Sequence, residues 1–102
     1  MNDYILLMHS DATYHAAADD GDGDDWGAYI AMLRASGQFD GGSSIGAGEC
    51  VQKNQPGRPA RSELTGFIRV RATNLEDARR FLIGNPVYEG GGTVEIRELP
   101  KD

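Results

Sequence analysis

The residues of this 102-residue chain best suited to proton transfer are its two histidines, His9 and His15. Imidazole titrates near neutral pH and is the commonest general acid or base in enzymes. His9 ends an apolar stretch, and Asp11 follows two residues later with a carboxylate that could orient the ring. We therefore treat His9 as a candidate general base assisted by Asp11. The alternative is that both histidines have structural roles only.

A second candidate site is a set of aromatic and basic side chains on one face of two expected strands: Phe67, Arg69, Arg71 and Arg97. Residues 64–71 and 93–99 alternate with period two, which places these side chains on the polar faces of the two strands. An aromatic wall with fixed guanidinium groups suits a small organic anion, because Arg binds a carboxylate through two hydrogen bonds. The alternative is that the arginines form ion pairs across strands, for example with Glu95.

Three further patterns resemble functional motifs but lack the structural context that those motifs need. Residues 42–46 fit G-x-S-x-G, yet a nucleophile elbow needs a strand before the serine and a helix after it, and here the expected order is reversed. Residues 20–24 alternate Asp and Gly, but the Gly and Glu later in a calcium loop are missing, so a solvated acidic loop is expected. Cys50 has no His or Lys next to it and is expected to be a buried, inert thiol. No metal site and no cofactor are expected.

Composition limits the partners of the chain. The net charge is −6, and residues 1–33 hold seven acidic and no basic residues. With a pI near 4.7, the chain would repel the phosphates of nucleic acids and of anionic membranes. One cysteine rules out an intramolecular disulfide and suits a reducing cytoplasm, and no signal peptide or membrane span is recognisable. We expect a cytoplasmic protein with a single domain over residues 1–102.

The elements that must position these residues follow the order β-α-β-β-α-β. The expected strands are residues 4–9, 49–53, 64–71 and 93–99, with residues 54–59 as a Pro-Gly hairpin loop. One helix begins at Asp24 or Asp25 and ends at Gly37, and another is capped by Asn74 and ends at Gly84. This order is typical of a ferredoxin-like α+β fold, with two helices on one face of an antiparallel sheet.

The first expected strand differs from the others, because residues 4–8 are apolar at consecutive positions. Such a strand is expected to be buried on both faces, whereas two helices can cover only one face of the sheet. A second copy of the same sheet is the simplest cover for the other face. The sequence thus predicts a homodimer.

A family resemblance agrees with this architecture. The segments YILLMHSD, AYIAMLRASGQFDGGSSI and LTGFIRVRATNLEDARRFLIGNPVYEGGGTVEIREL resemble the YCII-related (DGPF) family over nearly the whole chain. The resemblance implies a ferredoxin-like α+β domain that pairs into a dimeric α/β barrel. Two departures stand out: the Asp-Gly-Pro-Phe stretch is absent, with residues 56–62 in its place, and Trp26 stands where the YCII branch has a histidine of a His-Asp pair.

Two hypotheses about function follow. The first is a homodimer that binds a small anionic or aromatic metabolite between its subunits, through Phe67, Arg69, Arg71 and Arg97. The second is a small lyase, isomerase or dehydrohalogenase that uses His9 as general base. The first depends on the face of the first strand left uncovered by helices, and the second depends mainly on the family resemblance.

Overall fold

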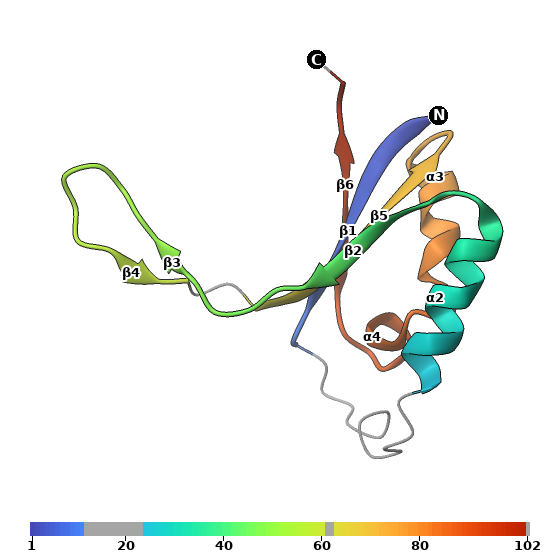
Figure 1. The fold of residues 1–102 in the computed structure, drawn as a ribbon, viewed down its shortest axis with the longest axis horizontal. Coiled ribbons are helices and arrows are strands. Elements are labelled where there is room, and N and C mark those ends of the chain that lie inside the picture. The colour runs from blue at the N-terminus through green and yellow to red at the C-terminus, as the bar shows by residue number, and fades with distance from the viewer. Residues whose placement is uncertain (12–23, 61–62, 102) are drawn as a thin grey trace.

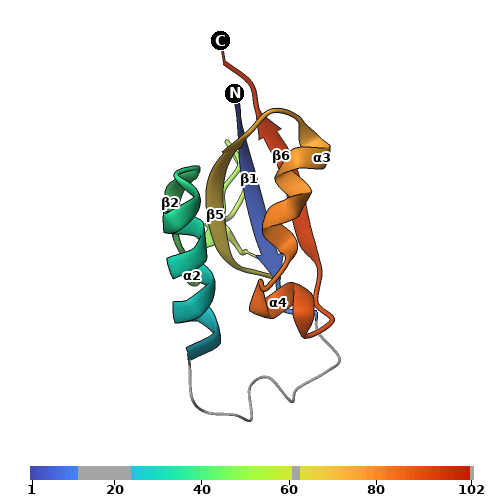
Figure 2. The ribbon, with the colours of Figure 1, turned by 90° about the vertical axis from the view of Figure 1, so that its right-hand side faces the viewer.

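The computed structural model describes residues 1–11, 24–60 and 63–101. Its main sheet has four antiparallel strands in the order β2-β5-β1-β6: β2 (Phe39–Ser44), β5 (Leu64–Ala72), β1 (Asn2–His9) and β6 (Val94–Leu99). The helical segments are α2 (Asp24–Ser36), α3 (Leu75–Ala78), the 3₁₀ turn η1 (Arg79–Leu82) and α4 (Pro86–Glu89). They lie on one face of the sheet (Figure 1, Figure 2). This is the ferredoxin-like α+β fold predicted from the sequence.

The hydrophobic core lies between the sheet and the helices. From β1, alternate side chains point into it, so Tyr4, Leu6 and Met8 are buried whereas Ile5 and Leu7 are half-buried on the opposite face. The other core residues are Tyr29, Leu33, Ile68, Val70, Ala72, Ala78, Phe81 and Leu82. Within one chain, therefore, only one face of β1 is fully buried. We call the other side of the sheet the far face.

The helix boundaries follow the local signals in the sequence. The side chain of Asn74 caps α3 by accepting a hydrogen bond from the Asp77 amide at 2.8 Å. Gly37 and Gly84 adopt φ values of 74° and 83°, which confirms them as left-handed residues that follow helical segments. The structure adds a short helix that the sequence did not predict: α4 begins at Pro86 and is capped by the buried Asn85. Proline is well suited to the first turn of a helix because its missing amide has no partner there.

The position predicted for the second strand was wrong. The strand that pairs with β5 is β2, inside the glycine- and serine-rich stretch, whereas β3 (Glu49–Cys50) pairs only with β4 (Arg58–Pro59) in a separate two-stranded ribbon. A hairpin loop in the expected region is confirmed, since the chain between Cys50 and Arg58 joins the antiparallel strands β3 and β4. Its hydrogen-bonded turn, however, runs from Gln52 to Gln55, rather than through Pro56 and Gly57. The left-handed residue of that turn is Asn54, at φ 66°.

No helix within the described parts of the chain is long and apolar enough to cross a membrane.

Candidate functional site

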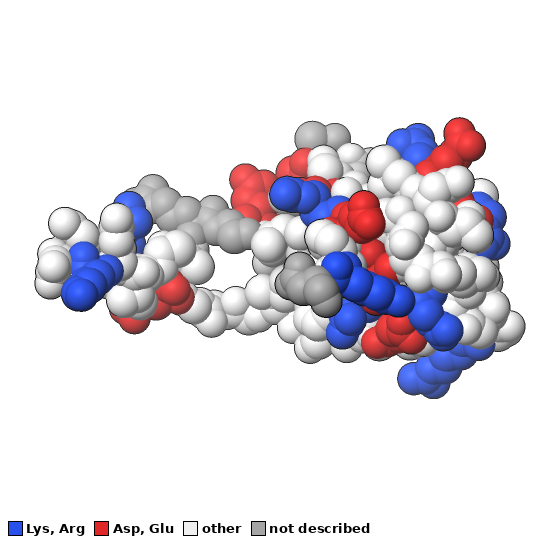
Figure 3. All heavy atoms as spheres, turned by 90° about the horizontal axis from the view of Figure 1, so that it is seen from above, with Lys and Arg blue, Asp and Glu red and all other residues white. Residues whose placement is uncertain are grey.

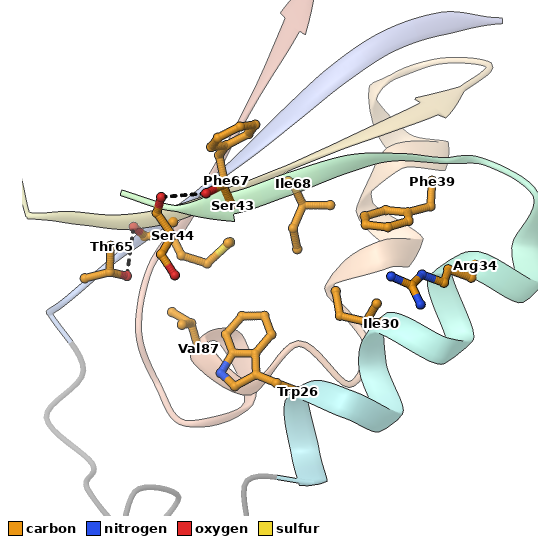
Figure 4. Close-up of a pocket in the computed structure, with 13 residues that line it drawn as sticks. Trp26, Ile30, Arg34, Phe39, Ser43, Ser44, Thr65, Phe67, Ile68 and Val87 are labelled. Carbon is orange, nitrogen blue, oxygen red and sulfur yellow. Dashed lines mark hydrogen bonds between the residues drawn. The ribbon is translucent and has the colours of Figure 1, made fainter. Parts of the chain in front are cut away.

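A cleft of about 580 Å³ lies between α2 and the helix-side face of β2 and β5 (Figure 4). It is lined by Met8, Trp26, Ile30, Arg34, Phe39, Gly42, Ser43, Ser44, Thr65, Gly66, Phe67, Ile68 and Val87. The cleft does not coincide with the site predicted on the far face of the sheet.

Helix α2 supplies one wall of the cleft through residues spaced by four. Trp26, Ile30 and Arg34 line the cleft, whereas Tyr29 and Leu33 on the neighbouring stripe are buried in the core. Residues four apart lie on the same face of a helix, so one helix can serve both purposes. Trp26, on the cleft stripe, is accordingly 39% exposed.

Two glycines supply the floor of the cleft by leaving room above the sheet. Gly42 lies opposite Ile68 in the ladder, and Gly66 lies opposite Ser44, all on the helix side. A Cβ at Gly42 would overlap the Phe67 carbonyl oxygen, and a Cβ at Gly66 would lie 3.2 Å from the Ser43 carbonyl oxygen. The absence of side chains here thus allows β2 to approach β5 and leaves space beneath α2.

The lining of the cleft is mostly apolar and aromatic, with three hydroxyl residues, Ser43, Ser44 and Thr65, and one cation. Trp26 and Phe39 contribute rings, and in Figure 4 the Arg34 side chain lies beside Phe39 at one end of the cleft. Arg34 forms no ion pair with any residue that the structure describes. The lining contains no His, Asp, Glu, Lys, Cys or Tyr, so no lining side chain is a conventional acid or base near neutral pH.

His9 lies on the far face and contacts a different carboxylate from the one expected. Its Nε2 lies 3.0 Å from Glu95 Oε1, and Arg97 Nη1 donates to Glu95 Oε2 at 3.0 Å. The hydrogen bonds from Arg97 and then His9 hold the pKa of Glu95 below its ordinary value. His9, Glu95 and Arg97 thus form a continuous polar chain, which we call the far-face triad.

Asp11 is engaged elsewhere. Its two carboxylate oxygens accept hydrogen bonds from the side chain and the backbone amide of Thr93, at 2.6 and 2.8 Å. These bonds hold the pKa of Asp11 below its ordinary value, and nearby His9 adds a smaller electrostatic contribution. His9 and Asp11 are close, but Glu95 is the carboxylate that His9 contacts directly.

The four residues predicted to bind an anion are only partly brought together. Strand register places Arg69 and Arg97 on either side of Ile5, and Phe67 beside Leu7, all on the far face. Arg71 is held at the β2 side of the sheet instead: its Nε donates to Asp40 Oδ2 at 3.0 Å and its Nη2 to the Gly37 carbonyl at 2.7 Å. Arg71 thus forms an ion pair across strands, as in the alternative that the sequence left open, whereas Arg97 pairs with Glu95 of its own strand.

Other sequence expectations have mixed outcomes. Cys50 is exposed, not buried, because it lies on the β3–β4 ribbon. Of the acidic stretch 20–24, residues 20–23 lie outside the described residues. His15, the other candidate histidine, also lies outside them. Among those that are described, no three His, Cys, Asp or Glu side chains gather as a metal site would require. The sequence analysis did not identify Arg34 and Phe39 as residues of a binding site. For Arg34, the four-residue spacing of Trp26, Ile30 and Arg34 could have indicated a shared helix face.

Comparison with known proteins supports the fold. No family model matches the chain, and no curated protein matches it. Among solved structures, the chain is similar to the 5-chloro-2-hydroxyhydroquinone dehydrochlorinase TftG from Burkholderia phenoliruptrix AC1100, solved in complex with 2,5-dihydroxybenzoquinone. The TM-score is 0.55 at 14% sequence identity, over 97% of this chain and 95% of that one. At this identity the likeness shows a shared fold.

Proposed function

We propose that this chain is a small-molecule-binding protein that holds a small aromatic anion in the cleft beneath α2. The observation that carries the proposal is Arg34, which is the one charged residue in the lining of a mostly apolar cleft and has no ion-pair partner among the described residues. A cation in that setting is a ready partner for a carboxylate, and the aromatic walls suit a ring.

The size of the cleft fits this class of ligand. A volume of about 580 Å³ lies within the range of small-molecule sites, which run from roughly 300 to 1,000 Å³. TftG, a solved structure with the same fold, is a complex with 2,5-dihydroxybenzoquinone, a single-ring compound. This supports a ligand of one ring, without identifying the ligand of this chain.

The resemblance to the YCII-related family favours binding over catalysis in this cleft. Trp26 stands where the YCII branch has a histidine, and Trp26 lines the cleft. An indole cannot transfer a proton near neutral pH, and no other lining residue replaces the imidazole. We therefore propose a member of that family whose cleft has retained binding and lost acid–base chemistry.

The test uses Trp26, which is the only tryptophan of the chain. Titration with benzoate should give a saturable change in intrinsic fluorescence, and benzyl alcohol should bind more weakly because it lacks the charge. Arg34→Gln should weaken benzoate binding by about tenfold or more, the scale expected for a lost charge-assisted hydrogen bond. It should change benzyl alcohol binding by less than twofold.

The matched control is Arg79→Gln. Arg79 is an exposed arginine that does not line the cleft. Benzoate binding should be unchanged in this variant. Absence of a saturable signal with millimolar benzoate, or equal effects of the two substitutions, would overturn the proposal.

A second candidate function is supported by the contact between His9 and Glu95. An imidazole hydrogen-bonded to a carboxylate at 3.0 Å can act as a general base, and the similar solved structure is a dehydrochlorinase. Release of chloride from chlorinated hydroquinones is the direct assay. An enzyme of this kind loses turnover in His9→Gln and retains it in Arg34→Gln; turnover that survives His9→Gln rules out this base.

We also propose that the protein is a cytoplasmic homodimer that pairs through the far face. Ile5, Leu7 and Phe67 are half-buried there although no helix among the described residues covers them. A second copy of the sheet would bury these side chains and would flank them with Arg69 and Arg97. A single cysteine without a possible partner in the chain suits a reducing compartment.

A further inference from the structure

Residues 46–60, which we call the arm, extend away from the rest of the molecule. The ladder between β3 and β4 joins only two residue pairs, and every residue of the arm is exposed. The radius of gyration is 15.2 Å, whereas a compact domain of this length has about 13 Å. The arm therefore has no contact with a core of its own chain.

An arm of this kind is poorly stabilised by itself. A two-stranded hairpin is at best marginally stable in water, because it buries too little apolar surface to offset the loss of backbone entropy. The arm nevertheless carries an apolar side chain near its tip, Val51, which is 74% exposed. Contact with another molecule would bury Val51 and hold the hairpin in place.

The direction of the arm identifies the side on which that molecule lies. The helices lie to the right of the sheet in Figure 1, and the arm extends to the left, on the far-face side. Figure 2, viewed from the helix side, shows the arm behind the sheet, in agreement. The arm thus extends from the same side of the sheet as the far face. A molecule that binds the far face would therefore also contact the arm.

The charge of the arm favours an acidic partner. The arm holds Lys53, Arg58 and Glu49, a net charge of +1, which leaves −7 for the remainder of the chain. Figure 3 shows the basic side chains of the arm standing clear of the acidic and basic groups of the body. In the observed geometry the arm extends away from its own body, whereas a second copy would bring to it a body whose net charge is −7.

We propose that the arm is a dimerisation arm, which lies against a second copy of this chain seated on the far face. The proposal rests on the homodimer proposed above and adds a specific contact to it. In a twofold dimer the contact occurs twice, because each copy presents one arm and receives the other. Val51 packs against the partner, and Lys53 and Arg58 face its acidic body.

The test compares two substitutions that place the same charge on an exposed apolar side chain. Val51→Asp alters the arm, and Ile83→Asp alters the helix side, where Ile83 is 68% exposed. Analytical ultracentrifugation should show at least a tenfold increase in the dimer dissociation constant for Val51→Asp and an unchanged constant for Ile83→Asp. Circular dichroism should show both variants folded, because neither side chain belongs to the core.

A second measurement uses Cys50, the only cysteine of the chain and a residue of the arm. A nitroxide label at this position should be mobile in dilute protein and immobilised at concentrations where the dimer forms. If Val51→Asp leaves the dimer dissociation constant unchanged, or if the label stays mobile in the dimer, the proposed role of the arm is wrong. The homodimer itself would not be contradicted by either result. A monomer at hundreds of micromolar overturns both, and the fluorescence titration of the cleft is independent of either result.

Discussion

Glu95, on the edge strand β6, links His9 and Arg97 on the far face. One of its oxygens contacts His9 and the other contacts Arg97, each at 3.0 Å. The carboxylate is partly exposed, so these contacts contribute little to global stability, but they fix the direction of the His9 ring. The far-face triad is thus a means of orienting an imidazole, whether or not the imidazole reacts.

The first prediction concerns the titration of Glu95. Because Arg97 makes the largest contribution to its lowered pKa, Arg97→Gln should raise the pKa of Glu95 toward the ordinary value of 4.5, and His9→Gln should raise it less. A lowered pKa in the folded state means that ionised Glu95 stabilises the fold above pH 4.5 and that this contribution is lost as the pH falls below it. Carboxyl ¹³C NMR titration of the three proteins checks the order, and equal pKa values would contradict it.

At the scale of elements, the sequence predicted those features that depend on neighbouring residues. Asn74, Gly37 and Gly84 mark helix boundaries through local hydrogen bonds and backbone conformation, and the alternation in β5 fixes its two faces. The position of β2 could not be read in this way. Its glycines and serines have low strand propensity, and the strand exists because its backbone pairs with β5, which follows some twenty residues later.

The cleft was missed for a related reason. Sequence patterns show the side chains that are present, whereas the floor of the cleft is created by the side chains that Gly42 and Gly66 lack. The contact between His9 and Glu95 joins residues 86 positions apart, so the nearer Asp11 was the carboxylate that sequence spacing suggested. Both features depend on strand register, which the order of elements alone does not supply.

The second prediction tests whether Gly42 fixes the position of β2. Gly42→Ala should lower the free energy of unfolding by about 1–3 kcal/mol, because its Cβ would overlap the backbone of Phe67 and force the two strands apart. Gly46→Ala is the control, since a Cβ there meets no atom within 4 Å and Gly46 has no positive φ. Urea unfolding measures both; equal stabilities for the two variants would show that the ladder tolerates the added methyl group.

At the scale of the whole molecule, the two faces of the sheet offer two different surfaces. The helix side contains the cleft, and the far face carries half-buried apolar groups beside the arm. Binding of a ligand and pairing of two copies would thus use largely different residues, with Phe67 common to both sets. This differs from the arrangement expected from the sequence, in which the ligand lies between subunits.

The last prediction separates these two arrangements. Leu7 lies on the far face opposite Phe67 and Glu95, so Leu7→Asp should prevent dimer formation by placing a charge in the contact. If the cleft beneath α2 is the binding site, the monomeric variant should bind benzoate within about twofold of the wild-type affinity, as reported by Trp26 fluorescence. Ile83→Asp, which stays dimeric, controls for the added charge. Loss of benzoate binding in folded, monomeric Leu7→Asp would instead place the ligand between subunits, where Phe67, Arg69 and Arg97 would be its contacts, because only that site requires two copies.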